Sequence, residues 1–459
     1  MQPLSNSRRR FRSSSNVTMD SQHNAFPSKK YYFARLPIEL QTQIFTECIS
    51  QPFGQLMDEH QAPQVLVSVC KDWRDLAYST SSLWSSFEVH FGTWTLNFKD
   101  PEGDAVLLSR MKLWLRRSGN HFLSVKLLYE PPMPFPRDRK LSRFPEEALA
   151  LLVQHSSRWR DIELAIPSAC FTPLLQSTSE LHFPLLNTLI LDPTHLPPPY
   201  RSEPLDACTL ASNCGQLTKL HINLEAGRSL TLDDCRSILS QNPNITSCTL
   251  YVQCEGSPTP TAEKLSLPVL SELHLMVYSN RVMVESYPER ALTAFLGGLD
   301  LYMLKYLHID WLLNTNRQAW SSSHPAFISF LEPLKPTLES LRLGYVPMSE
   351  AQVMECLRAV PFLTFVELLF TFGEEPDGPA ITDRLWRGLT FVGGDEVNGG
   401  YTPGTLLPLL QSMKLQCHGS GCSEKELMRF VNSRADMKSL EFRSLSASDC
   451  HAGSAYGEI

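Results

Sequence analysis

Hydrophobic residues recur along most of this chain as a triplet, with two positions between the first and second apolar residues and one between the second and third. Eleven triplets follow one another at a mean spacing of 31.5 residues, from 315 positions over ten intervals. Side chains alternate between the faces of a strand, so the last two apolar residues of each triplet share a face. Repetition at this period predicts stacked, short parallel strands with helices or loops behind them. The central residues of the triplets are Val125, Ile162, Leu189, Leu220, Cys248, Leu273, Leu307, Leu341, Val366, Met413 and Leu440.

The residue between the last two apolar positions of each triplet is predicted to point away from the core. Ten of these eleven residues are polar, which indicates that the other face of the sheet meets solvent. The residue directly before the central apolar position of each triplet is predicted to lie on the same solvent-facing side. This second row is also largely polar, except for Tyr306 and Phe365. They flank Arg342 and neighbour His308, and exposed aromatics beside arginine are typical of binding hot spots. We therefore predict that Tyr306, His308, Arg342 and Phe365 form part of a target-binding surface; the alternative is that a loop covers them.

Upstream of the triplets, the apolar spacing changes to that of helices. From Leu36, apolar residues recur at +4, +8, +9, +12 and +13, and Pro37 falls at the first helical position, where its missing N–H has no cost. A second helix is predicted to start at Ala62-Pro63 and to continue to Ala77. A unit of about 45 residues has a small core, and such units often complete it against a partner or a neighbouring domain.

These two helical segments resemble an F-box. The match rests on Leu36-Pro37-Ile38-Glu39-Leu40 with Ile44-Phe45, and on Val69-Cys70-Lys71-Asp72-Trp73-Arg74. Leu83-Trp84 and residues 114–119 resemble the F-box-like proteins of mushroom-forming fungi, although the connector at 51–61 is longer and more polar than in the compact motif. The resemblance implies docking onto the Skp-type adaptor of a cullin–RING ubiquitin ligase. The implied contact residues are Leu36, Pro37, Leu40, Ile44, Phe45, Val69, Cys70 and Trp73.

An apolar stripe from two helices, centred on a tryptophan, also suits the core of a buried interface. The alternative is that these side chains pack only on each other.

The triplets are similar to divergent leucine-rich repeats. The regular family has Asn three residues beyond the last apolar position, but here those places hold residues such as Glu130, Pro167 and Thr194. An irregular curvature is therefore expected. The predicted fold class is α/β: a small N-terminal helical F-box over residues 31–90, then an irregular leucine-rich-repeat solenoid of about eleven units over residues 91–459, with parallel inner strands and outer helices or loops.

Two stretches fit neither pattern. Residues 1–30 are basic and Ser-rich, with Ser7-Arg8-Arg9-Arg10 and no acidic residue before Asp20. Such a segment buries too little apolar surface to fold, so a disordered tail is expected; a nuclear-import or phosphate-binding patch and a mitochondrial presequence are the alternatives. Residues 391–404 are Gly-rich, lack the Gly-Lys-Ser/Thr of a phosphate loop, and are expected to form a flexible insertion. Long loops on a repeat array often lie beside the binding face, which leaves a functional role open for this stretch.

Composition narrows the classes of function. The 459 residues carry a net charge of −7, and the pI near 6.0 argues against a nucleic-acid-binding body. No apolar run reaches the roughly 18 residues of a membrane span, and no signal peptide opens the chain. The twelve cysteines are expected to be free thiols in a reducing compartment, which places the chain in the cytoplasm, the nucleus or both.

No catalytic or metal-binding motif emerges. His-Glu-x-x-His, Gly-x-Ser-x-Gly and Cys-x-x-Cys are missing, and the spacing of Cys417, His418 and Cys422 fits no common zinc site. We expect no cofactor and no enzymatic activity. The leading hypothesis is a substrate adaptor, in which the box binds a Skp-type adaptor, and through it a cullin–RING ligase, while the solenoid recruits an unknown target protein. The alternative is an interaction scaffold that uses the same adaptor without ubiquitination.

Overall fold

The strands of this computed structural model pair side by side in one 14-stranded sheet, in which every pairing is parallel. The structure describes residues 32–49, 54–56, 60–92, 101–130, 144–176, 182–192, 214–223, 230–254, 263–278, 288–312, 320–370, 381–391, 405–418, 422–434 and 437–445. The strands in spatial order are β1 (Gly54–Gln55), β2 (Ser86–Gly92), β3 (Leu123–Glu130), β4 (Trp159–Ala165), β5 (Thr188–Leu191), β6 (Lys219–Ile222), β8 (Ser247–Gln253), β10 (Glu272–Tyr278), β12 (Tyr306–Trp311), β13 (Ser340–Gly344), β14 (Phe365–Leu369), β15 (Ser412–His418) and β16 (Ser439–Leu445). Beside this path, β7 (Leu230–Thr231) pairs with β8, while β9 (Leu265–Ser266) and β11 (Leu299–Asp300) form a separate two-stranded sheet.

The eleven predicted triplets lie on the eleven successive strands from β3 to β16, with β7, β9 and β11 beside them. Their central residues stand opposite one another: Val125 pairs with Ile162 at one end of the array, and Met413 pairs with Leu440 at the other. These central side chains are buried, apart from the partly buried Leu440. The repeat spacing therefore predicted both strand order and register.

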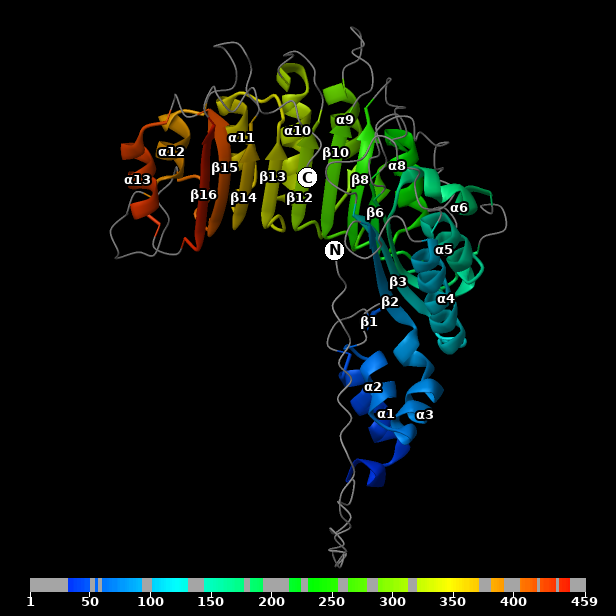
Figure 1. The fold of residues 1–459 in the computed structure, drawn as a ribbon. Coiled ribbons are helices and arrows are strands. Elements are labelled where there is room, and N and C mark those ends of the chain that lie inside the picture. Colours follow the sequence, from blue (N-terminus) through cyan, green and yellow to red (C-terminus); the bar gives the residue numbers. More distant parts are fainter. Residues whose placement is uncertain are drawn as a thin grey trace, which may run out of the picture.

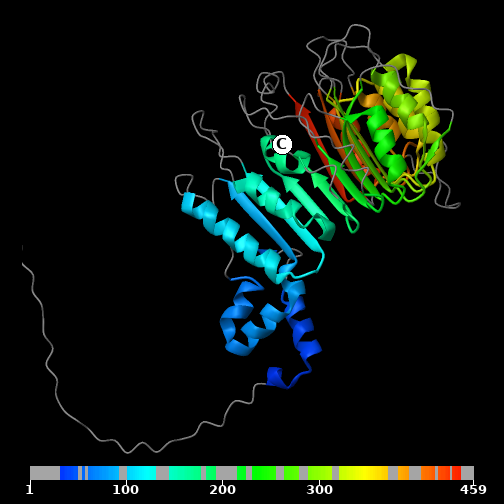
Figure 2. The ribbon, with the colours of Figure 1, turned by 90° about the vertical axis from the view of Figure 1, so that its right-hand side faces the viewer.

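Helices cover one face of the curved sheet, and Figures 1 and 2 show them along its convex side. Their sequences supply local start signals, such as the N-terminal capping boxes in which Thr231 pairs with Asp234 and Ser349 pairs with Gln352. Their inner faces pack on the buried side of the strands. These helices are α4 (Pro101–Arg117), α5 (Phe144–Val153), α6 (Thr172–Gln176), α8 (Leu232–Gln241), α9 (Pro288–Gly297), α10 (His324–Leu331), α11 (Glu350–Ala359), α12 (Asp383–Leu389) and α13 (Glu424–Asn432).

The N-terminal helical unit lies beyond the first strands of the sheet (Figure 1). It contains η1 (Tyr32–Arg35), α1 (Ile38–Glu47), α2 (Gln64–Val69), α3 (Lys71–Ser79) and η2 (Ser81–Trp84). The single helix predicted from Ala62-Pro63 to Ala77 is wrong, because Cys70 is extended (φ −157°, ψ 175°) and divides it into α2 and α3. Pro37 caps α1 and directly precedes its first residue.

The sheet begins earlier than the triplets indicated. Strand β2 starts at Ser86, inside the range predicted as helical, and its Phe87 and Val89 are buried. The polar connector between the two helical segments also contributes: β1 pairs with β2, and Leu56 is fully buried. The predicted tail at 1–30 and nearly all of the Gly-rich stretch lie outside the described residues. No helix in the described part of the chain is long and apolar enough to cross a membrane.

Candidate functional site

The residues predicted to contact an adaptor divide into a packed group and an exposed group. Phe45 is fully buried, and its ring centroid lies 5.0 Å from that of Trp73. Phe33 completes the cluster, with its centroid 4.8 Å from that of Trp73 and 5.6 Å from that of Phe45. Phe45 and Trp73 therefore hold α1, α3 and η1 together, and changing either would disturb the helical unit itself.

The exposed group presents apolar side chains to solvent. The exposed fraction is 45% for Leu40, 40% for Ile44 and 54% for Val69. Pro37 and Cys70 are exposed as well, and Leu36 is half-buried. Helix α1 is exposed over most of its surface, with Phe45 as its buried residue; positions 37, 40 and 44 follow the 3–4 spacing of one helical face.

Sequence reasoning missed two members of this exposed group. Ile38 is 57% exposed, and Val65 shares a face of α2 with Val69 and is 37% exposed. Clustered apolar side chains on small helices mark interaction surfaces more often than isolated ones do. The spacing of Val65 and Val69, four residues apart, was a signal that could have identified the pair.

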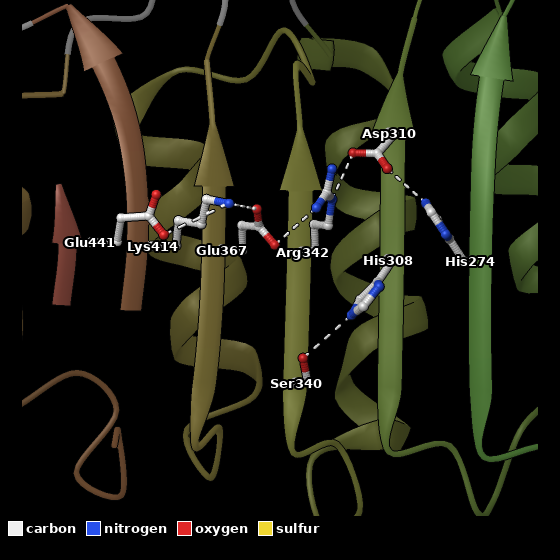
Figure 3. A network of polar contacts seen from close by, with 8 residues as sticks. All are labelled: His274, His308, Asp310, Ser340, Arg342, Glu367, Lys414 and Glu441. Carbon is white, nitrogen blue, oxygen red and sulfur yellow. Dashed lines mark hydrogen bonds and ion pairs between the residues drawn. The ribbon is translucent and has the colours of Figure 1, made fainter. Parts of the chain in front are cut away.

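The second candidate surface is the concave face of the sheet. Figure 3 shows its C-terminal half, with side chains on the face turned away from the helices. The first row here consists of Ser124, Asp161, Thr188, Lys219, Ser247, Glu272, Tyr306, Ser340, Phe365, Ser412 and Ser439. The second row consists of Lys126, Glu163, Ile190, His221, Thr249, His274, His308, Arg342, Glu367, Lys414 and Glu441.

A ladder of alternating charges crosses this face from Asp310 on β12 to Glu441 on β16 (Figure 3). Arg342 Nε donates to Asp310 Oδ1 at 2.9 Å, and its Nη1 donates to Glu367 Oε2 at 3.0 Å. Lys414 Nζ lies 3.3 Å from Glu367 Oε1 and 3.9 Å from Glu441 Oε2. Both carboxylates beside Arg342 are buried, so the guanidinium supplies a partner for charges that would be costly to bury alone.

Asp310 is the member of this ladder that sequence reasoning missed. Burial alone would raise its pKa, but hydrogen bonds from His274 and Arg342 and the charge of Arg342 lower it below the ordinary value. His274 Nε2 lies 2.7 Å from Asp310 Oδ2. Two residues beyond His308 on the same strand face, Asp310 could have been found by extending the alternation past the triplet.

The four residues predicted to bind a target do come together on adjacent strands, but they differ in charge, in exposure and in whether they are already paired within the chain. Arg342 is committed to Asp310 and Glu367. Burial, with the charges of His274 and Arg342, lowers the pKa of His308 to about 4, so this ring is neutral at neutral pH. Tyr306 is 38% exposed and Phe365 is partly exposed, so no described loop covers either ring completely. That this group binds a target stays a prediction.

Among the described residues, no group of three His, Cys, Asp or Glu side chains is placed to hold a metal ion.

No protein-family model matches the chain, and neither does any curated protein. Among solved structures, the chain is similar to one from the crystal structure of the Rad7 and Elc1 complex in yeast, with 14% identity, a TM-score of 0.45 and coverage of 88% of each chain.

Proposed function

We propose that this protein is a non-enzymatic substrate adaptor of a cullin–RING ubiquitin ligase. The N-terminal helical unit binds a Skp-type adaptor, and the concave face of the sheet holds a target protein near the ubiquitin-charged enzyme. The chain then contributes proximity, because it raises the local concentration of target lysines at that enzyme. It works where such ligases assemble, in the cytoplasm, the nucleus or both.

The observation that carries the proposal is the exposed apolar surface of α1 and α2. Leu40, Ile44 and Val69 lie within the segments that resemble an F-box, and all three are at least 40% exposed. Apolar side chains held in water on two short helices gain free energy when a partner covers them. The packed cluster of Phe33, Phe45 and Trp73 beneath them fixes their positions in advance, which limits the entropy lost on binding.

The test is co-purification of the full chain with a Skp-type adaptor. Leu40→Asp/Val69→Asp places charges on the exposed surface without entering the aromatic cluster, whereas a Trp73 substitution would also weaken folding. Val106→Asp/Met428→Asp is the matched control, because both residues are 49% exposed and lie on α4 and α13. We expect each interface substitution to weaken binding by about 2 kcal/mol, roughly thirtyfold in Kd, and the control pair to bind as wild type does.

Failure of the wild-type chain to bind, or equal binding by the Leu40→Asp/Val69→Asp variant, would contradict the proposal. Adding a cullin to the purified complex of chain and adaptor distinguishes the proposed function from a second candidate, an interaction scaffold. A complex of chain and adaptor that excludes the cullin would instead support a scaffold that acts without ubiquitination.

A further inference from the structure

The two ends of the sheet differ in how much strand edge they leave (Figure 1). At one end, β1 is two residues long; at the other, β16 is seven residues long and pairs with β15 but with no further described strand. Native proteins usually shorten or cover edge strands, because unpaired backbone groups bind other strands. The outer edge of β16 is therefore the place where another strand can extend the described sheet.

The hydrophobic core is also incomplete beside β16. Met413 and Leu415 on β15 are 2% and 0% exposed, whereas Leu440 and Phe442, which pair with them in register on β16, are only partly buried. Apolar surface that is still partly open gains free energy when another element covers it. We call this surface the end face; it consists of Leu427 and Val431 on α13 and Leu440 and Phe442 on β16.

The backbone of β16 has a defined inner and outer side. The N–H of Ser439 donates to the carbonyl of Gln411, in the chain that leads into β15. Successive residues of a strand turn their backbone groups to alternate sides, so the N–H and C=O groups of Leu440, Phe442 and Ser444 face away from β15. Each of these three residues therefore offers one donor and one acceptor to another strand.

The geometry of this edge suits a second copy of the same strand. Phe442 is the middle residue of β16, which runs from Ser439 to Leu445. A two-fold axis through this point, perpendicular to the sheet, pairs all seven residues of one copy with those of the other in antiparallel order. Phe442 then faces Phe442 of the second copy with its outward backbone groups, and the helices of both copies stay on the same side of the sheet.

The charges along β16 are complementary in this register alone. Glu441 stands opposite position 443 of the second copy, which is an arginine, and the symmetry produces this pair twice. The two positions form a non-hydrogen-bonded pair, in which the Cα atoms of antiparallel strands approach to about 4.5 Å. Moving the axis by one residue in either direction would place Glu441 opposite Glu441, or Arg443 opposite Arg443.

Glu441 has little to hold it within its own chain. Its side chain is 67% exposed, and its ion pair with Lys414 Nζ is long, at 3.9 Å. Lys414 lies closer to Glu367, at 3.3 Å. The carboxylate of Glu441 is therefore available to a cation across the edge.

We propose that β16 pairs antiparallel with β16 of a second copy of this chain, so that one continuous sheet runs through a symmetric dimer. The axis also brings the end faces of the two copies together, with α13 of each beside α13 of the other. The two concave faces then join into one surface, with an N-terminal helical unit at each far end. This inference stands apart from the proposed function, because it needs neither an adaptor nor a target.

The first experiment measures self-association of the full chain by sedimentation equilibrium under reducing conditions. We expect the wild-type chain to be a dimer at micromolar concentrations. Glu441→Arg and Arg443→Glu each place like charges opposite one another twice, so each should weaken the dimer about tenfold or more. Glu272→Arg, another exposed carboxylate of the concave face, is the matched control and should leave the dimer unchanged.

Mixing the two weakened variants tests the register itself. In a dimer of one Glu441→Arg copy and one Arg443→Glu copy, each arginine again faces a glutamate. The mixture should therefore form a heterodimer about as tightly as the wild-type chain forms its dimer. A monomeric wild-type chain, or a mixture that associates no better than the separate variants, would overturn the proposal.

A backbone variant tests the strand pairing without changing charge. Ser444→Pro removes an outward N–H that the chain's own sheet does not use, whereas Ser444→Ala keeps it. The proline variant should weaken the dimer about tenfold or more, because the symmetry removes two hydrogen bonds, and the alanine variant should change it less than twofold. Thermal unfolding of the monomeric proline variant checks that the chain still folds, and equal association of the two folded variants would contradict the pairing.

A deletion of residues 446–459 tests whether the chain covers this edge itself. We expect the deletion variant to associate as the full chain does. Tighter association of the deletion variant would mean that these residues occupy the edge, and would overturn the assignment to a second copy. Because no adaptor is present in these measurements, their failure is distinct from a failure of the co-purification.

Discussion

Gly344 is required by the carboxylate it faces. It pairs in register with Asp310, and a Cβ at this position would overlap Asp310 Oδ1 and lie 3.1 Å from its Cγ. Asp310 is 2% exposed and is held by Arg342 on one oxygen and His274 on the other. The carboxylate therefore has no free direction in which to move, and Gly344→Ala must displace it from at least one of these partners.

The expected loss of stability follows from those contacts. A hydrogen bond to a charged group contributes about 1.5–3 kcal/mol, and overpacking by one methyl adds about 1–3 kcal/mol. Partial relaxation reduces their sum, so we expect Gly344→Ala to lower the local free energy of unfolding around β12 to β14 by about 3 kcal/mol. Native-state hydrogen exchange at pH 7 should then show amides of these strands exchanging about a hundredfold faster.

Two further variants test whether the effect of Gly344→Ala comes from the overlap with Asp310. Gly297→Ala is the matched control, because a Cβ there meets nothing within 4 Å and should leave exchange unchanged or slightly slower. In an Asp310→Ala background, Gly344→Ala should lose most of its effect, since the overlapping carboxylate is gone. An effect below about 1 kcal/mol in wild type, or the same effect in both backgrounds, would refute the reasoning.

Two further predictions concern buried ionisable groups. Arg434 is 8% exposed and its guanidinium donates to three leucine carbonyls, so Arg434→Met should lower the stability around α12 and α13 by about 3 kcal/mol; exchange rates there that match wild type would contradict this. For His308, whose pKa falls from 6.5 to about 4 on folding, the unfolded chain binds an extra proton between those values. Stability should therefore fall as the pH drops through this window. As the pH is lowered through this window, the urea midpoint of His308→Gln should fall less steeply than that of the wild-type chain. Equal slopes in the two proteins would contradict the assignment of this pH dependence to His308.

The repeat could be predicted from sequence because parallel pairing between consecutive units is local. Once Leu307 and Leu341 are assigned as equivalent, their strands must pair in register, and every other position follows. The first strands escaped detection because β1 has two residues, and because the triplet Trp84, Phe87 and Val89, whose last two residues lie on β2, falls in the range assigned to the helical unit. The break at Cys70 was also hidden, since the apolar spacing continues across it although the backbone is extended there.

The site was less predictable than the fold because contacts, unlike register, depend on which side chain reaches which partner. Sequence placed Arg342 on the correct face and suggested that it was available to a target. The structure instead directs it to Asp310 and Glu367, one strand away on either side. Alternating charge along a row is thus better interpreted as an internal ladder than as a set of available binding groups.

The connection between the helical unit and the sheet bears on how the two proposed surfaces work together. Trp84 donates its Nε1–H to the carbonyl of Ala77 at 2.7 Å, and its ring centroid lies 5.1 Å from that of Trp114 on α4. The Arg117 guanidinium lies over the rings of both Tyr78 and Trp84, at 4.1 and 4.5 Å from their centroids. Buried aromatic packing of this kind joins α3, η2 and α4 without a flexible linker. Under the proposed function, the distance from adaptor to target would then be a fixed property of the chain, and the position of a lysine within the target would decide whether it can be reached.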